Sequence, residues 1–452
     1  MTFRKSDNLN NRSDKGSSAR RLANRFRILK PMRIRDFALL WTAMTVSLLG
    51  DGIYYVAIAW QVYRLSNVPT ALSLVWAAWT LPMVGFLIVG GVISDRFDRR
   101  KVMITSDIVR GLAIATIGVL SLTQTLELSH LFVLVALYGT GEAFFGPAFG
   151  AIVPDLVPKN LLVEANSLDQ FVRPLMLRMM GPALGGATIA LFGIGEAFLV
   201  DAGTFVLSAI ALMAMSARPI ARSGGGASAV REIKQGLSFV RSHTWLWGTL
   251  TAASIGLLLF WGPFEVLVPY IVKNQLNGDA ADLGFVYAWG GVGAILAALV
   301  LGQRGLPRRH MTFMYTAFGI SIGVTAGFAF ATSMWQAMVW SFISGGTATA
   351  GMVVWGTLMH TLVPREMLGR VTSLDWMVSI GLVPVSFALT GPAAGLFGVD
   401  RTMIGAGIAG GVVFTAFLFL PGMRDTERSR NGLRAQPLPV LVEKDENEIE
   451  VA

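Results

Sequence analysis

Runs of about 20 apolar residues recur along most of this chain, and they constrain its fold more than any other feature. In a bilayer every backbone polar group must find its partner inside the protein, so runs of this length form membrane-spanning α-helices. The composition agrees, because 53% of the 452 residues are hydrophobic and only 14% are charged, too few to cover a soluble globule. The sequence therefore predicts an all-α membrane protein with many spans.

The apolar runs predict twelve transmembrane helices, and the longest connection between them divides the helices into two sets of six. The predicted spans lie near residues 37–62, 71–93, 103–123, 131–152, 165–191, 197–216, 245–272, 283–302, 311–331, 335–360, 372–397 and 402–421. The parts expected are a basic tail (1–35), an N-terminal six-helix bundle (36–217), a linker (218–244), a C-terminal six-helix bundle (245–422) and a disordered tail (423–452). Within the linker, Ser223–Ser228 reads as a flexible hinge and Val230–Val240 as an amphipathic helix on the membrane surface.

Most of the 37 Lys and Arg residues fall in alternate connections between the predicted spans. Connections rich in Lys and Arg stay in the cytoplasm, so we expect both termini there and a multi-pass protein in the plasma or inner membrane. The same asymmetry explains the net charge of +9 without a nucleic-acid partner. No cysteine, clustered histidine or phosphate-binding lysine loop is present, so we expect no enzyme activity, no metal and no ATP as the energy source.

One charged connection, Gly90–Lys101 with the sequence GGVISDRFDRRK, follows an apolar run and carries a recognisable pattern. It resembles the signature loop between helices two and three of the major facilitator superfamily, usually Gly-x-x-x-Asp-Arg-x-Gly-Arg-Arg. The matching residues are Gly91, Asp95, Arg96, Arg99 and Arg100, whereas Asp98 stands where that family has glycine. The alternative is a basic loop that only sets the topology.

The two halves of the chain repeat each other. Leu156–Gln170 aligns without gaps with Leu362–Trp376, and both segments begin Leu-Val-Pro and share Ser-Leu-Asp near their ends. Duplicated parallel halves are the architecture of that superfamily. Within it, three segments, PDLVPKNLLVEANSL at 154–168, GPALGG at 181–186 and LVPREMLGRV at 362–371, resemble the proton-coupled drug exporters that include macrolide and enterobactin exporters. This resemblance implies a monomer with two pseudo-symmetric halves, a small-molecule substrate and the proton gradient, with no cofactor, as the energy source.

Charges within the spans mark candidate sites for proton coupling, because a charge inside a membrane is costly and usually faces a cavity or a partner. Asp51 and Glu142 lie nearest the centres of their helices and are the predicted proton carriers, although many related exporters have an arginine in helix four rather than Glu142. Arg173 and Arg178 on helix five are their predicted opposite charges. The alternative is that these groups form buried ion pairs that only fix helix packing.

The duplication also predicts an inner gate at the cytoplasmic side. Asp95 would accept from the N-terminal end of helix eleven, and Arg99 or Arg100 would reach Asp375. Asp169 is the repeat partner of Asp375, so a second, weaker contact is expected between Asp169 and the loop between helices eight and nine.

Three further sets of residues complete the expectations. Helix breaks that allow bending are predicted at Gly181, Pro182, Gly391 and Pro392, with close helix packing as the alternative. A substrate cavity is predicted from Tyr54, Phe145, Trp261 and Glu265, with packing or lipid contact as the alternative for the aromatics.

Asp107 and Arg110 are expected to form a local pair or a partner for the signature loop, and Asp201 is expected to pair with Glu265 or to line an outward cavity.

Together these features predict a proton-coupled secondary transporter that exports amphipathic small molecules by alternating access. A dedicated siderophore exporter is the nearest alternative, because Arg173 and Arg178 suit an anionic ligand. A membrane receptor or scaffold without transport is an alternative from another class, which mid-span carboxylates and duplicated halves disfavour.

Overall fold

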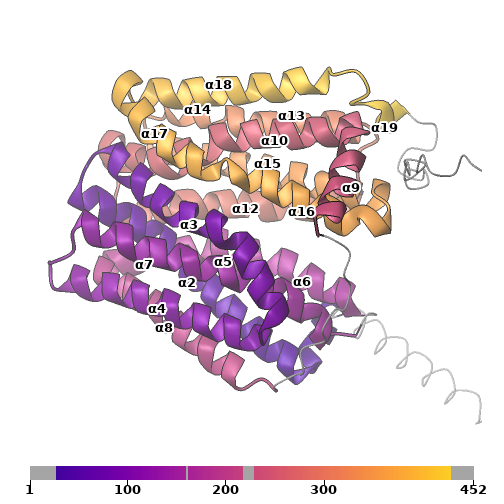
Figure 1. The fold of residues 1–452 in the computed structure, drawn as a ribbon. Helices are drawn as coiled ribbons and strands as arrows, with labels where there is room; N and C mark the ends of the chain where they lie inside the picture. Colours follow the sequence, from indigo (N-terminus) through magenta and orange to yellow (C-terminus); the bar gives the residue numbers. More distant parts are fainter. Residues whose placement is uncertain (1–26, 159–160, 217–228, 429–452) are drawn as a thin grey trace, which may run out of the picture.

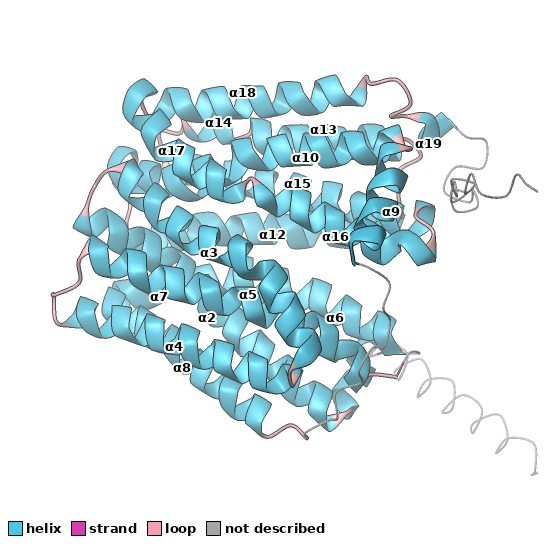
Figure 2. Cartoon of the chain, in the orientation of Figure 1, coloured by secondary structure: helices cyan, strands magenta, loops and turns pink. Residues whose placement is uncertain are grey.

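The computed structural model describes residues 27–158, 161–216 and 229–428, and within these ranges every regular element is a helix (Figure 2). The predicted hinge Ser223–Ser228 lies outside the described residues, as do 1–26 and 429–452 of the two tails. The described part agrees with the all-α prediction.

The N-terminal half consists of helices from η1 to α8 (Figure 1). They are η1 (Arg27–Arg33), α2 (Arg35–Leu65), α3 (Pro69–Arg96), α4 (Arg99–Leu122), α5 (Leu128–Leu156), α6 (Leu162–Pro174), the π-helix η3 (Leu175–Met180), α7 (Gly181–Leu191) and α8 (Ile194–Met213).

The C-terminal half runs from the linker helix to the end of the described chain. Its helices are α9 (Ala229–Arg241), α10 (Thr244–Gly262), η4 (Pro263–Leu267), α11 (Val268–Tyr270), η5 (Ile271–Gln275), α12 (Ala280–Arg304), α13 (His310–Gly323), α14 (Thr325–Phe328), α15 (Met334–Leu362), α16 (Arg365–Gly381), α17 (Val383–Phe397), α18 (Val399–Leu418) and α19 (Asp425–Arg428). The linker helix α9 packs on α16, and its Phe239 and Val240 are buried.

Eleven helical segments among the described residues are long and apolar enough to cross a membrane. The span predicted near 165–191 is not one of them, although α6, η3 and α7 follow one another without a break over residues 162–191. This stretch carries Glu164, Asp169, Arg173 and Arg178, which lower its hydropathy. The count of twelve spans therefore stays a prediction.

The buried hydrophobic side chains form three clusters, which differ in whether their residues come from one half of the chain or from both. One cluster contains residues of both halves, from Ile53 and Trp76 to Val266, Leu283 and Phe387. The second cluster belongs to the C-terminal half alone, and the third to the N-terminal half alone. The halves therefore share one hydrophobic core at one end and have separate cores at the other.

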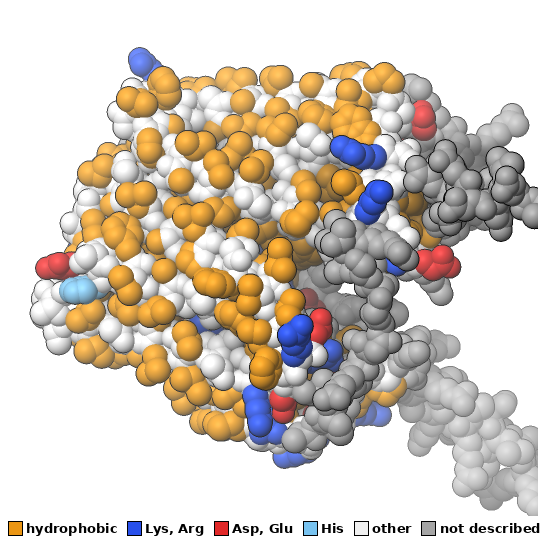
Figure 3. All heavy atoms as spheres, viewed as in Figure 1, with side chains coloured by type: hydrophobic (Ala, Val, Ile, Leu, Met, Phe, Trp, Pro, Cys, Tyr) orange, Lys and Arg blue, Asp and Glu red, His pale blue; other side chains and the backbone are white. Residues whose placement is uncertain are grey.

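We call the end with separate cores the basic end, because Arg96, Arg99, Arg100, Arg304 and Arg308 lie there, and the other the opposite end. Figure 1 shows the halves close together at the opposite end, on the left, and drawn apart where α6 and α16 lie. Figure 3 shows the orange side chains that cover the flanks of the bundle and the cationic side chains gathered toward the basic end.

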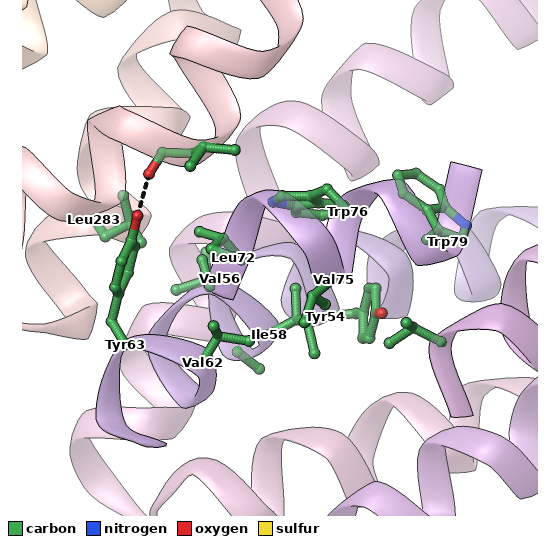
Figure 4. Close-up of a cluster of buried hydrophobic side chains, with 14 of the residues drawn as sticks. Tyr54, Val56, Ile58, Val62, Tyr63, Leu72, Val75, Trp76, Trp79 and Leu283 are labelled. Carbon is green, nitrogen blue, oxygen red and sulfur yellow. Dashed lines mark hydrogen bonds between the residues drawn. The ribbon is translucent and has the colours of Figure 1, made fainter. Parts of the chain in front are cut away.

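Hydrogen bonds join the two halves at the opposite end. The Tyr63 hydroxyl of α2 donates to the carbonyl oxygen of Val266 at 2.6 Å, and Leu283 of α12 lies beside it (Figure 4). The Asn67 side chain donates to that of Asn274 at 2.6 Å, and Lys273 donates to the carbonyl oxygen of Tyr63. These contacts close the opposite end of the space between the halves.

Helices α3 and α17 complete this closure through a small-residue contact. Gly391 of α17 approaches Thr70 and Ser73 so closely that a Cβ there would lie 2.5 Å from the Thr70 Cα. The Gly391 amide donates to the Ser73 hydroxyl at 3.0 Å, and that hydroxyl donates to the Phe387 carbonyl oxygen.

Two expectations about the tails were wrong at their inner edges. Residues 27–33, predicted as part of a flexible tail with a surface helix near Arg20–Leu29, form the 3₁₀ helix η1, which packs on α6 and α2. Residues 425–428, predicted as disordered, form α19, because Glu427 accepts from the backbone amide (2.6 Å) and the hydroxyl (3.0 Å) of Thr312 at the start of α13. A carboxylate at a helix N-terminus satisfies amides that have no partner within the helix.

The packing of α3 on α5 gives a first prediction. A Cβ on Gly139 of α5 would meet the Trp79 carbonyl oxygen and lie 2.8 Å from its ring, whereas a Cβ on Gly146 of the same helix would meet nothing within 4 Å. We expect Gly139→Val to destabilise the protein by about 1–3 kcal/mol through overpacking, seen as a lower thermal unfolding midpoint in detergent. Gly146→Val is the control, and equal midpoints for the two variants would contradict the helix contact.

Candidate functional site

Asp51, a predicted proton carrier, lies in the middle of α2 and faces the neighbouring helix α5. Its Oδ1 accepts a hydrogen bond of 2.6 Å from the Tyr138 hydroxyl. Asp51 is only partly buried, whereas Tyr138 is fully buried and stacks on Tyr54, with ring centroids 4.9 Å apart. A carboxyl in this position has a neutral donor as its hydrogen-bond partner and can bind or release a proton without breaking an ion pair.

Glu142, the second predicted carrier, lies one turn further along α5 on the same side as Tyr138. Its Oε2 accepts from the indole Nε1 of Trp79 on α3 at 2.9 Å. Glu142 also has a neutral donor as its partner and is partly exposed. The structure therefore brings the two predicted carriers to one region of the N-terminal half, on either side of Tyr138.

The positive charge near these carboxyls belongs to Arg110 of α4. Its guanidinium forms an ion pair of 2.5 Å with Asp107, and the two side chains are 4% and 0% exposed. The guanidinium carbon lies 4.5 Å and 4.6 Å from the ring centroids of Phe145 and Phe205. Because Arg110 lies within electrostatic reach of both Asp51 and Glu142, it is the buried cation of this site.

Of the two predicted opposite charges, Arg173 lies within electrostatic reach of Asp51 and Glu142, as Arg110 does, but neither Arg173 nor Arg178 pairs directly with these carboxyls. Arg173 pairs with Asp169, one turn earlier on α6, at 3.1 Å, and Arg178 lies over the ring of Trp261 at 5.4 Å. Sequence reasoning missed the role of Arg110, because an aspartate and an arginine three residues apart on a helix are expected to pair only with each other. The available signal was its position halfway along an apolar helix, where an arginine is costly.

The structure forms the local pair expected of Asp107 and Arg110 and adds a third member, because the Ser208 hydroxyl of α8 donates to Asp107 Oδ2 at 2.6 Å. The alternative role of partner to the signature loop is not seen, since both side chains are enclosed between α4, α5 and α8.

Asp201 and Glu265 are not paired with each other, which corrects one of the two expectations for them. Asp201 of α8 is 0% exposed and lies inside the N-terminal half, so it does not line an outward cavity either. Glu265 in η4 is buried and accepts from the Tyr287 hydroxyl of α12 at 3.3 Å.

The predicted inner gate is not assembled in this structure. Arg99 pairs with Asp155 and donates to the Ala151 carbonyl oxygen of α5, so it lies within its own half. Asp375 of α16 accepts from the Trp355 indole (3.1 Å) and the Ser379 hydroxyl (3.2 Å) of its own half. The contacts drawn from Arg99 and Arg100 to Asp375 are therefore absent among the described residues in this conformation.

The signature loop itself is an ordered turn. Asp98 takes the family glycine's place with φ −58° and ψ 111°, so it needs no left-handed backbone, and its carboxylate caps α4 by accepting from the Arg100 amide at 3.0 Å. Arg100 donates to the carbonyl oxygens of Met213 (2.9 Å) and Met215 (2.7 Å) at the end of α8. Asp95 and Arg96 are exposed, whereas Gly91 is partly buried.

The two predicted helix breaks have different outcomes. Gly181 and Pro182 directly follow the π-helix η3, and a Cβ on Gly181 would lie 2.6 Å from the Cα of Gly52 on α2. In contrast, Gly391 and Pro392 lie inside α17, so no break falls there, and Gly391 shows the alternative, a close helix contact with α3. The interruption of this span falls at Leu382, between α16 and α17.

The residues of the predicted cavity do not share one space. Tyr54 is 1% exposed and belongs to the core that the two halves share, and Phe145 packs on Phe149 and on the Arg110 guanidinium. Trp261 is partly exposed, and Arg178 over its ring is exposed although it lies halfway along its span. Since α12 packs against η3 at Arg178, the exposed guanidinium lies between the halves, where solvent or a ligand can reach it.

Solved structures show the same fold. A bacterial homologue of the human lysosomal transporter Spinster, in an inward-facing and unoccupied conformation, matches with a TM-score of 0.64 and 13% identity, over 86% of this chain and 95% of that chain. A POT family transporter in complex with 5-aminolevulinic acid matches with a TM-score of 0.65 and 11% identity, over 84% and 95% of the two chains. The fold is therefore that of membrane transporters.

Residues 27–452 match the family described as transmembrane secretion effector. Similar proteins include the uncharacterized MFS-type transporter YfiS of Bacillus subtilis strain 168, 29% identical over 74% of this chain and 80% of that protein. The multidrug efflux pump Tap of Mycolicibacterium fortuitum is 27% identical over 86% and 96%, and macrolide efflux protein A of Streptococcus pyogenes is 22% identical over 82% and 92%.

The chain thus belongs to the transmembrane secretion effector family of the major facilitator superfamily, and it is a multi-pass transporter of the cell membrane. The resemblance drawn from Gly90–Lys101 and from the duplicated halves is confirmed.

The buried pair of Asp107 and Arg110 generates a second prediction. Removing one partner leaves a buried charge without compensation, so Arg110→Met is expected to cost about 3–5 kcal/mol of stability. The readout is the thermal unfolding midpoint of the purified protein. Asp155→Asn, which breaks a partly exposed pair, is the control and is expected to cost about 1 kcal/mol or less. An unfolding midpoint of Arg110→Met equal to the control's would show that the pair is not structural.

Proposed function

We propose that this protein exports amphipathic small molecules in exchange for protons, by alternating access between its two halves. The observation that supports the proposal is that Asp51 and Glu142 lie near the middle of the apolar helices α2 and α5, each with a neutral hydrogen-bond donor and both within electrostatic reach of the buried Arg110 guanidinium. Such carboxyls can change charge when they exchange protons, and that change in charge can favour one conformation over another.

The arrangement of the hydrophobic cores supports alternating access. One shared core at the opposite end and two separate cores at the basic end fit a state that is closed on one side and open on the other. With the positive-inside rule, the basic end faces the cytoplasm, both termini lie there and this state is inward-open. A monomer suffices, because the site lies within one chain.

The substrate class is proposed from the relatives and from the exposed surface between the halves. Two relatives are named as multidrug and macrolide efflux proteins. The ring of Trp261 under Arg178 offers an exposed aromatic and cationic surface, and the buried Glu265 lies four residues further along the chain. Such a surface suits large amphipathic molecules, which need apolar contact and few fixed polar partners.

The third prediction concerns proton coupling. Asp51→Asn and Glu142→Gln should each abolish proton-driven efflux of a macrolide such as erythromycin from an efflux-deficient host, because the neutral amides cannot carry a proton. Efflux is measured at matched protein levels, and Glu127→Gln, an exposed carboxyl at the opposite end, is the control. Full proton-driven efflux by both variants would refute the assignment, whereas loss of protein alone would indicate a packing role.

The inner gate is proposed to form in the other conformation, when the basic end closes. Asp95 is exposed in the present state and would then accept from the N-terminal end of α16, while Arg99 or Arg100 would move to Asp375. The weaker repeat of this gate would join Asp169 to the loop that precedes α13. Contacts of this kind are each worth about 1 kcal/mol, and two of them shift a two-state equilibrium about tenfold or more.

The fourth prediction tests this gate by distance. Spin labels at Phe97 and Ser373, both exposed, report the separation of α3 and α16 in a chain that has no cysteine of its own. Asp95→Asn should reduce the population with the shorter distance, because it removes the negative charge that attracts the α16 end. Asp98→Asn is the matched control, since asparagine is an equally good helix cap. Identical distance distributions in the wild type and Asp95→Asn would eliminate the gate.

A further inference from the structure

The N-terminal half buries more negative than positive charge. Asp51, Asp107, Glu142 and Asp201 lie within electrostatic reach of Arg110, the one cation buried in this cluster. Asp107 takes the ion pair with Arg110. Burying several uncompensated carboxylates is far more costly than protonating them, so some of these groups must be neutral.

Asp201 is the most enclosed of the carboxyls that lack an ion pair. It is 0% exposed, and its Oδ2 has no hydrogen-bond partner among the described residues. An ionised carboxylate has room for about four hydrogen bonds and normally fills them when buried, whereas a neutral acid requires fewer. Asp51 and Glu142, in contrast, are partly exposed and each accepts a hydrogen bond of 2.9 Å or less.

The contact of Asp201 with Thr204 also fits a neutral acid. The Thr204 Oγ1 lies 2.7 Å from the Asp201 carbonyl oxygen and 3.3 Å from its Oδ1. A hydroxyl has a single hydrogen, which serves the nearer carbonyl oxygen best. The Thr204 hydroxyl therefore gives the Asp201 carboxyl only a long contact, which does little to stabilise an ionised carboxylate.

A glycine places Asp201 next to the predicted proton carrier. A Cβ on Gly50, which directly precedes Asp51 on α2, would overlap Asp201 Oδ1 and Thr204 Oγ1. Gly50 therefore allows the Asp201 carboxyl to lie against the backbone of α2. The other titratable groups that face Asp201 are Tyr54 of α2, Tyr138 of α5 and Arg110 of α4.

We propose that Asp201 is a second proton-binding site, which stores a proton inside the N-terminal half and exchanges it with solvent through Asp51. The proton leaves the Asp201 carboxyl for the Asp51 carboxylate, which is partly exposed and can release it to water. A sodium ion fits less well, because it needs five or six oxygen ligands and the site offers one carboxyl and one hydroxyl. This proposal rests on the proton coupling proposed above.

The first test detects the proton directly and needs no substrate. In the infrared spectrum of the purified protein, a protonated carboxyl gives a C=O band that is separate from carboxylate bands and moves in D₂O. This band is expected in the difference spectrum of wild type minus Asp201→Asn, and absent from wild type minus Glu196→Gln, a matched change on the same helix. A Thr204→Val variant should shift the band without removing it, which identifies Asp201 even if Asp201→Asn folds poorly.

The second test counts protons per substrate in proteoliposomes. The pH gradient that balances a known gradient of radiolabelled erythromycin gives the ratio, which is expected to fall by one proton in Asp201→Asn and to stay unchanged in Glu196→Gln. Absence of the carboxyl band, or an unchanged ratio in Asp201→Asn, would overturn the second site. If wild-type vesicles showed no proton-driven transport, the proposed function would fail, and the infrared band would still decide whether Asp201 holds a proton.

Discussion

The hydrophobic core that the two halves share at the opposite end is the constraint on which the rest of the structure depends. Tyr63, Leu283 and Phe387 bury their side chains in it from different halves, and close approaches such as Gly391 on Thr70 remove the space between the helices. Packed cores of this kind have discrete arrangements rather than a continuous range, which fits the proposed rocking of the halves between states without loss of their internal packing. The separate cores at the basic end would keep each half rigid during that proposed movement.

Charge inside the N-terminal half is the second constraint, and it acts through the first. Asp107 pairs with Arg110 on α4 and accepts from Ser208 on α8, which fixes the two helices against each other. Asp51, Glu142 and Asp201 also lie within electrostatic reach of the Arg110 guanidinium. Adding or removing a proton in this cluster changes the electrostatic energy of one half as a unit. Gly181, directly after η3, packs on Gly52 of α2, next to Asp51, and η3 also contacts α12, so the proposed change of charge would occur beside a contact between the halves.

Sequence reasoning reached the helical fold and the family and singled out the two mid-span carboxyls, because apolar run length, the Gly90–Lys101 loop and a charge within a span are local signals. It missed partners that come from other helices. Arg110 was expected to pair within its own helix, and only the packing brings it within electrostatic reach of Asp51, ahead of Arg173, which pairs with Asp169 on α6. The break at Leu382 rather than Gly391 was missed for the same reason, since a proline within an apolar run does not by itself reveal which turn is interrupted.

The most direct test of the account measures both ends of the bundle in the same protein. One pair of spin labels at Val68 and Arg401 reports the opposite end, and a second pair at Phe97 and Ser373 reports the basic end, in separate samples titrated over the same pH range. The account predicts two distances at each end whose populations change together, the basic end closing as the opposite end opens, with the same pH midpoint. Opening of one end without closure of the other, or populations that do not respond to pH, would contradict proton-coupled rocking of the two halves.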